Sequence, residues 1–263
     1  MPLSASVMSE RPRTSTAPER ARRADRPRTV ILRPAARKAL LRRMLLVRRA
    51  TLDRLARLTG LAAPELLAFR RELVVEGIPD QILDRGAGTS FVSELPQGVL
   101  LYLLVRALRP RRIVETGVRP GYSTAWLLAA LRANRSGELT SLGPGSGAGR
   151  APGVELAGIG QLVAPALRAP WTLDLTSAPD HFEHVLASGG PVQMIFLDNG
   201  PEADRTRAEI RTAWRGLAPG GLLLAHRIAT SPAWEEFCRH QGLRPQVLDA
   251  GPPPLGALSL RAT

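Results

Sequence analysis

The segment VETGVRPGYST, Val114 to Thr124, holds the residues of this sequence best suited to binding a polar ligand. It joins an apolar run to a helical pattern through Gly117 and Gly121, and the acid Glu115 lies at the end of the apolar run. Glycine lets a backbone approach a ligand closely, and a helix N-terminus presents N–H groups that have no partner within the helix. The segment therefore predicts a ligand site near Ser123. A tight strand-to-helix turn that needs its glycines only for the bend gives the same pattern.

Two further polar residues each end an apolar run that predicts a strand. Asp198 ends PVQMIFLD, the strongest strand pattern in the sequence, and His226 ends GLLLAH. In parallel sheets ligands bind beyond the carboxyl ends of the strands. Asp198 is therefore a candidate catalytic or substrate-orienting carboxylate, and His226 is a candidate general base that removes a proton from a hydroxyl. The structural alternatives are an Asp that caps a helix and a His that packs beside Arg227.

The remaining residues that bind metals in other proteins do not form a convincing set. His181 and His184 are three residues apart in DHFEHVL, and we interpret this spacing as a solvated helix face rather than a pair of metal ligands. Cys238 is the one cysteine, so it cannot form an intramolecular disulfide. We predict no metal site.

Patterns typical of strands and helices alternate from Leu95 onward. In chain order they are a helix at residues 96–110, a strand at 111–116, a helix at 123–134, strands at 138–142, 171–175 and 191–199, a helix at 208–217, a strand at 219–228 and a helix at 231–241. A glycine-rich stretch at 143–153 predicts a loop. The alternation predicts an α/β fold, doubly wound, with a mostly parallel sheet covered by helices on both faces.

The N-terminal third has a different composition. Residues 1–34, rich in Pro, Ser, Thr and Arg, predict a disordered basic tail, and residues 35–94 predict a helical extension or cap. Within it, 35–49 reads as an Arg-rich amphipathic helix, and 51–73 reads as two helices separated near Gly60. This pair has the spacing of a helix-turn-helix, so contact with DNA stays open beside a purely structural role. Residues 95–263 form the predicted α/β domain.

The net charge of +13 is concentrated in one part of the chain. Residues 1–50 hold 14 basic and three acidic residues, whereas the rest holds 22 basic and 20 acidic ones. Only one basic residue is lysine, which is typical of a GC-rich genome, and the tail has no aromatic residue to stack on bases, so a nucleic-acid partner is not expected. No apolar run reaches the roughly 18 residues of a membrane span and no signal peptide is visible, so we expect a cytoplasmic protein without membrane contact.

The stretch from about residue 95 to residue 241 resembles the class I S-adenosylmethionine-dependent methyltransferases, in particular small bacterial members with an ETGV-type first motif. The resemblance is carried by ELPQGVLLYLLVRALRPRRIVETGVRPGYSTAWLLAAL, by IGQLV before a WTL strand, and by AWRGLAPGGLLLAHRI with the trailing AWEEFC. It implies a Rossmann-like fold, S-adenosylmethionine as cofactor and, as activity, O-methylation of a small molecule. It also implies that Glu115, Gly117, Gly121 and Ser123 line the methionine end of the cofactor, with Glu115 near the amino group.

Several positions depart from the family pattern. The second strand runs into Gly143, where family members have an acid that accepts both ribose hydroxyls. A Gly-Asp-Ser turn near the adenine is replaced by TSA at 176–178, which leaves Ser177 as a cofactor-binding candidate. Asp198 is kept, but Pro201 replaces a common His. His226 and its neighbour stand where two acids are frequent, so a divalent metal built on those acids is not expected.

Three functions remain open from the sequence. The first is a working methyltransferase with a small-molecule substrate, either as a monomer or as a homodimer through the helix at 35–49. The second is a catalytically degenerate relative that keeps the fold as a scaffold or binding module. The third is a nucleic-acid-binding protein that uses its basic N-terminal region.

Overall fold

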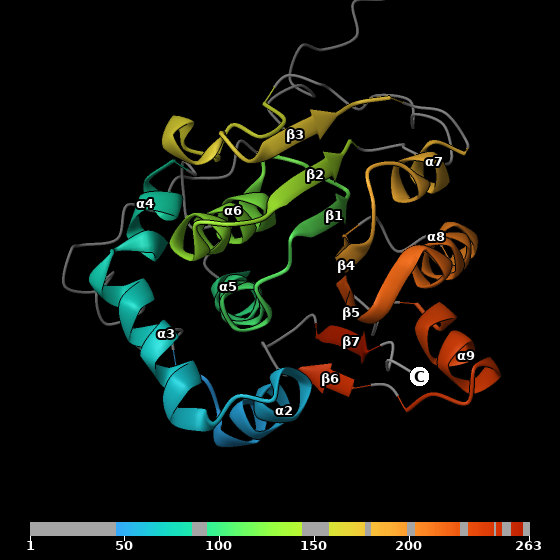
Figure 1. Cartoon of the computed structure of the whole chain (residues 1–263), viewed down its shortest axis with the longest axis horizontal. Coiled ribbons are helices and arrows are strands. Elements are labelled where there is room, and N and C mark those ends of the chain that lie inside the picture. The colour runs from blue at the N-terminus through green and yellow to red at the C-terminus, as the bar shows by residue number, and fades with distance from the viewer. Residues whose placement is uncertain are drawn as a thin grey trace, which may run out of the picture.

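The structure is a computed structural model that describes residues 46–85, 94–143, 158–176, 180–198, 203–226, 231–244, 246–248 and 254–259. Figure 1 shows the elements along the chain. The helices are α2 (Arg49–Thr59), α3 (Ala63–Val75), α4 (Ile78–Arg85), α5 (Leu95–Leu108), α6 (Tyr122–Asn134), the short 3₁₀ helix η3 (Pro165–Leu167), α7 (His181–Ala187), α8 (Ala203–Gly216) and α9 (Ala233–His240). The strands are β1 (Arg112–Thr116), β2 (Glu138–Leu142), β3 (Trp171–Asp174), β4 (Val192–Leu197), β5 (Leu217–His226), β6 (Gln246–Leu248) and β7 (Leu255–Ser259).

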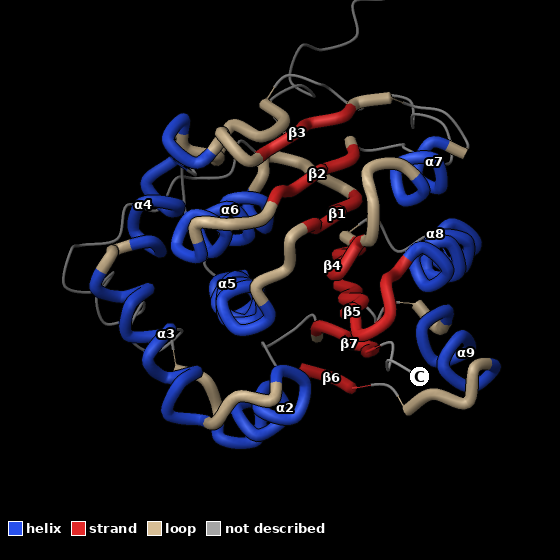
Figure 2. The backbone as a smooth tube through the Cα atoms, in the orientation of Figure 1, coloured by secondary structure: helices blue, strands red, loops and turns tan. Residues whose placement is uncertain are grey.

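The strands form one sheet in the order β3-β2-β1-β4-β5-β7-β6. The first five are parallel, and β7 runs antiparallel between β5 and β6. Figure 2 shows α5 and α6 on one side of this sheet and α7, α8 and α9 on the other. The predicted doubly wound, mostly parallel α/β fold is therefore confirmed. Because the chain order reverses between β1 and β4, the carboxyl ends of these two strands form the crevice in which such folds bind ligands.

Burial explains why the central elements form as they do. Every residue of β1 is buried, and so are nearly all residues of β4, as is typical of parallel strands with helices on both faces. Two apolar cores result, one on each side of the sheet. Helix α5 is buried from Leu95 to Val105 apart from Pro96, because it lies between the sheet and the helical extension.

The helical extension follows part of the prediction. The two helices expected within 51–73 are α2 and α3, with Gly60 ending α2 in the left-handed conformation at φ 72°. Figure 1 shows α2, α3 and α4 as an arc around α5 and α6. Of the helix expected at 35–49, residues 35–45 lie outside the described residues, 46–48 have no regular structure, and Arg49 begins α2. Residues 1–45 and most of the expected loop at 143–153 lie outside the described residues.

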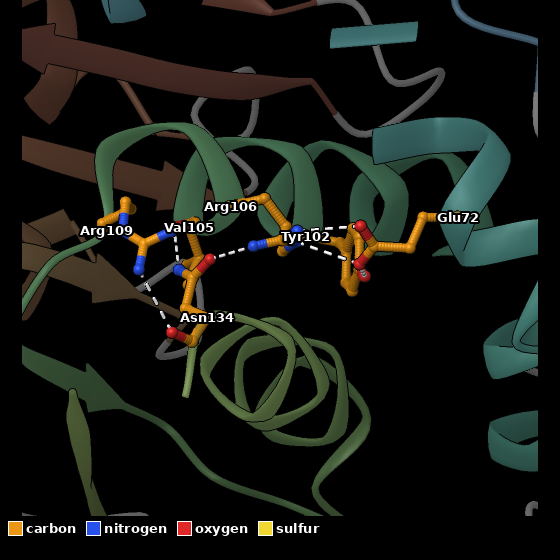
Figure 3. A network of polar contacts seen from close by, with 6 residues as sticks. All are labelled: Glu72, Tyr102, Val105, Arg106, Arg109 and Asn134. Atoms are coloured by element: carbon orange, nitrogen blue, oxygen red, sulfur yellow. Dashed lines mark hydrogen bonds and ion pairs between the residues drawn. The ribbon is translucent and has the colours of Figure 1, made fainter. Parts of the chain in front are cut away.

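A polar network ties α3 to α5 and α6 (Figure 3). The Glu72 carboxylate accepts hydrogen bonds from the Tyr102 hydroxyl at 2.6 Å and from Arg106 Nε and Nη2 at 3.0 and 2.8 Å. Arg106 also donates to the side chain of Asn134, whose amide donates to the Val105 carbonyl at 2.8 Å. One arginine thus joins three helices. None of the described helices is long and apolar enough to cross a bilayer.

Candidate functional site

The turn between β1 and α6 is built on two glycines with positive φ. Gly117 has φ 84° and Gly121 has φ 88°, a region that L residues with side chains rarely adopt. The N–H groups of Gly117 and Val118 donate to the Leu142 carbonyl at 3.1 and 3.2 Å, which fixes the turn against the end of β2. A Cβ atom at Gly121 would lie 3.0 Å from the Cα of Gly160, so this position also needs glycine for space.

A narrow cavity of about 60 Å³ opens above this turn. Its lining includes Gly117, Gly121, Ser123 and Asp198, together with Gln97 from α5. The four residues that the sequence assigned to a ligand site at the strand ends thus lie around one cavity. The cavity lies at the N-terminus of α6, where the backbone N–H groups of the first turn favour an anionic or strongly polar ligand group.

Glu115 is fully buried and does not line this cavity. Its carboxylate accepts hydrogen bonds from the hydroxyls of Ser123 at 2.5 Å, Thr124 at 2.7 Å and Ser141 at 2.6 Å. Burial raises the pKa of Glu115, and the three hydroxyl donors act against that rise. The carboxylate lies behind the first turn of α6 and holds Ser123 in place. Its expected position near the amino group of the cofactor stays a prediction.

Asp198 and His226 form a hydrogen-bonded pair across neighbouring strands. His226 Nδ1 lies 2.6 Å from Asp198 Oδ1, and the His226 side chain is only 2% exposed. The N–H of Asp198 donates to the Thr116 carbonyl at 3.1 Å, which keeps the end of β4 against the end of β1. Among the described residues, His226 Nε2 has no hydrogen-bond partner although it is buried. A carboxylate that fixes Nδ1 also orients the imidazole ring, an arrangement that general-base histidines use.

At the end of β2, where the family pattern has an acid, this chain has Gly143 and little space for a side chain. A Cβ atom at Gly143 would lie 2.7 Å from Leu175 Cδ2, so an acid at this position requires Leu175 to move. The N–H of Gly143 donates to the Asp174 carbonyl at 2.8 Å, which holds the ends of β2 and β3 together. Ser177, the candidate for the adenine end, lies outside the described residues, as do Pro201 and Arg227.

The sequence analysis missed Asp174, the last residue of β3. Its carboxylate accepts a hydrogen bond from the Thr176 N–H at 2.9 Å and lies 2.8 Å from His181 Nε2. Partial burial would raise the pKa of Asp174, but the Thr176 and His181 hydrogen bonds outweigh it and hold the pKa below its usual range. The interpretation of His181 as part of a solvated helix face is wrong, because its side chain is 13% exposed and paired with Asp174, whereas His184 is exposed. The signal available in the sequence was an acid at the carboxyl end of a parallel strand.

No group of three or more His, Cys, Asp or Glu side chains with the geometry of a metal site occurs among the residues that the structure describes. His226, at the end of β5, instead pairs with Asp198. Cys238 is buried in α9, and burial raises the pKa of its thiol to about 11. This thiol therefore has little tendency to ionise near neutral pH.

Residues 114–228 match a family model described as a methyltransferase domain. No curated protein matches the chain.

Among solved structures, the SAH-bound methyltransferase PaMTH1 from Podospora anserina is similar at 15% identity and a TM-score of 0.51, over 71% of this chain and 87% of that one. The cofactor-bound Rv0187 from MTB is similar at 18% identity and a TM-score of 0.50, over 72% of this chain and 90% of that one. The O-methyltransferase TomG from Streptomyces achromogenes, in complex with SAM, is 19% identical with a TM-score of 0.49, over 64% and 80%.

The first two structures share the fold, and the matched segment contains the glycine turn, Asp198 and His226. Residues 114–228 are thus similar to a methyltransferase domain, and the chain shares its fold with a solved methyltransferase.

Proposed function

We propose that this protein binds S-adenosylmethionine and methylates a hydroxyl group of a small molecule, with His226 as the general base. The observation that carries this proposal is the 2.6 Å pair between Asp198 and His226 at the ends of adjacent strands. A histidine held by a carboxylate at the ligand crevice of this fold suits removal of a proton from a weakly acidic hydroxyl.

The residues of the first turn fit the amino-acid end of the cofactor. Gly117 and Gly121 line the cavity, and Ser123 lies at the helix N-terminus with Glu115 behind it. The structural neighbours described as SAH-bound and cofactor-bound support the same ligand class. When bound, the cofactor supplies a methyl group that is already activated by its sulfonium charge.

The sugar of the cofactor needs an acceptor other than residue 143. Asp174 lies beside Leu142 in the register of β2 and β3, so its carboxylate stands one strand away from the usual position. It is 26% exposed and anchored by two donors, which leaves acceptor capacity on its oxygens. We assign Asp174 to the cofactor's hydroxyl groups.

The protein's own part in the reaction is to align the hydroxyl and to take its proton. The substrate hydroxyl would donate to His226 Nε2 and lose its proton there. The substrate oxygen would take the methyl group of the bound cofactor as the sulfur–methyl bond breaks, with S-adenosylhomocysteine as the leaving group. Asp198 accepts from Nδ1–H, keeps the ring in the tautomer that frees Nε2, and stabilises the imidazolium. Most of the rate enhancement then comes from the alignment of the reacting groups.

Turnover with His226→Gln tests this proposal. Purified protein is first offered a panel of phenols, catechols and aliphatic alcohols, and methyl transfer is detected by mass spectrometry. With an accepted substrate, His226→Gln is expected to lower kcat by about 10²–10⁴-fold while the Kd for S-adenosylhomocysteine stays unchanged. Asp198→Asn is also expected to lower kcat, because it removes the carboxylate that fixes the His226 ring.

Two outcomes contradict the proposal. Equal kcat for the wild type and His226→Gln would remove His226 as the base. Cofactor binding without transfer to any member of the panel would favour the degenerate binding module over the enzyme.

A further inference from the structure

A second cavity, of about 450 Å³, lies between the helical extension and α6. Its walls come from the C-terminal ends of α3 and α5, from α4, from the C-terminal half of α6 and from the segment around η3. It shares no lining residue with the cavity at Ser123 and Asp198. Helix α6 begins at the first cavity, and its C-terminal half lines the second from Ala129 onward, so the two cavities lie toward opposite ends of one helix. The volume is within the range of small-molecule sites, roughly 300–1,000 Å³.

The inner wall of this cavity is apolar. Ile82 and Leu162 are buried, at 3% and 1% exposure, and Ile78 and Leu167 are partly buried beside them. Aliphatic side chains in this arrangement favour a hydrocarbon chain or ring over a fully hydrated ligand.

The charges around the cavity have an excess of positive sign. Four arginines line it, namely Arg85, Arg106, Arg132 and Arg135, against the acids Glu72 and Glu76. Glu72 is neutralised by Arg106 at 2.8 Å in the network of Figure 3. The remaining three arginines are exposed, and Glu76 is the one further acid among the lining residues, so the charge of the lining favours an anion.

We infer that this cavity binds an amphipathic organic anion, with an apolar chain or ring against Ile82 and Leu162 and a carboxylate or phosphate at the arginines. Guanidinium groups pair with such oxyanions through two parallel hydrogen bonds, which suits a carboxylate or phosphate head. The inference does not depend on the proposed methyl transfer, because no residue is shared between the two cavities.

Calorimetric titration of the full chain with decanoate tests the inference, with decanol as the uncharged analogue and acetate as the anion without a chain. Decanoate is used below the concentration at which it forms micelles. It is expected to bind at least about tenfold more tightly than decanol or acetate and to raise the thermal midpoint of the protein.

The variant Arg85→Glu/Arg132→Glu changes two exposed side chains and is expected to weaken decanoate binding by about tenfold or more. Arg57→Glu makes the same kind of change at an exposed position of α2 that is not part of the cavity, and should leave the Kd unchanged. Leu167→Trp narrows the apolar side of the cavity. It should weaken decanoate binding without changing the charge of the cavity. Saturating S-adenosylhomocysteine should leave decanoate binding unaffected.

Any of four results overturns the inference. They are absence of decanoate binding, equal affinity for decanol, equal affinity in the double arginine variant and the wild type, and displacement of decanoate by S-adenosylhomocysteine. The last result would place decanoate in the methyl-transfer crevice instead.

Discussion

At the scale of single residues, Leu175 and Asp174 change the part of the site where β2 and β3 end. The Leu175 side chain fills the space that a side chain at position 143 would need, and Asp174 presents a carboxylate one strand further along the sheet. His181 and the Thr176 N–H hold that carboxylate in place. Asp174 is therefore the acid that we propose for the cofactor's hydroxyl groups.

Asp174→Asn is expected to weaken S-adenosylhomocysteine binding by about 1–3 kcal/mol, roughly 5–150-fold in Kd, because an amide replaces a charged acceptor. Glu138→Gln is the matched control, since it changes an exposed acid at the opposite end of β2. Calorimetry measures both. An unchanged Kd in Asp174→Asn would show that the sugar is held by other groups.

The sequence predicted that Gly117, Gly121, Ser123 and Asp198 belong to one site, because each lies at the end of a predicted strand or at the start of a predicted helix. It did not predict that Asp198 bonds to His226. That contact exists because β4 and β5 are neighbours with their carboxyl ends level, and strand order is a property of the whole sheet.

At the scale of elements, α5 and α6 pack closely because Gly98 leaves room for Trp126. A Cβ atom at Gly98 would lie 2.3 Å from the Trp126 ring. Trp126 is fully buried, so it cannot turn away into solvent. The packing of α5 against α6 therefore depends on a glycine inside α5. By helix propensity alone, a glycine inside a helix costs about 1 kcal/mol of stability relative to alanine.

Gly98→Ala is expected to lower the free energy of unfolding by about 1–3 kcal/mol, since overpacking exceeds the gain in helix propensity. Trp126→Phe removes the ring atoms that the new methyl group would meet. The double variant should be more stable than the sum of the two single changes indicates, and chemical denaturation of all four proteins gives the coupling. Additive effects would mean that the Gly98–Trp126 contact does not limit packing.

Elements with strong periodicity were predicted well, and short ones were missed. The parallel strands are apolar runs buried on both faces, which a sequence displays directly. Strand β6 has three residues, including Val247 at 39% exposure, and its antiparallel pairing with β7 depends on the edge left by β5. Helix α4 is only eight residues long and follows the turn at Gly77.

At the scale of the whole molecule, the helical extension is joined to the α/β domain through Glu72. Its carboxylate accepts hydrogen bonds from Tyr102 and Arg106 of α5. Arg106 also donates a hydrogen bond to the side chain of Asn134 at the end of α6. Burial would raise the pKa of Glu72, but the Arg106 and Tyr102 hydrogen bonds together with the Arg106 charge hold the pKa below its ordinary value of 4.5. The proposed boundary near residue 94 therefore separates parts that fold against each other.

Glu72→Gln is expected to reduce the free energy of unfolding at pH 7 by about 1–2 kcal/mol, because the ion pair and one acceptor are lost. A carboxylate with a lowered pKa in the folded state stabilises above its unfolded pKa and loses that effect as pH falls through the folded pKa. The difference between the wild type and Glu72→Gln should therefore shrink below about pH 4.5.

Denaturant titrations across pH measure this difference, and Glu76→Gln, an exposed glutamate one turn further along, is the control. A difference that is independent of pH would contradict the role of the Glu72 charge.

The most direct test of the central claim is calorimetric titration with S-adenosylmethionine and S-adenosylhomocysteine of the wild type, Gly117→Ala and Gly60→Ala. Both glycines have positive φ, but Gly60 has open space around it and Gly117 lines the cavity of the first turn. We expect micromolar binding to the wild type and to Gly60→Ala, and affinity at least about tenfold weaker in Gly117→Ala. Folded wild-type protein that binds neither compound, or equal binding by all three proteins, would contradict this expectation.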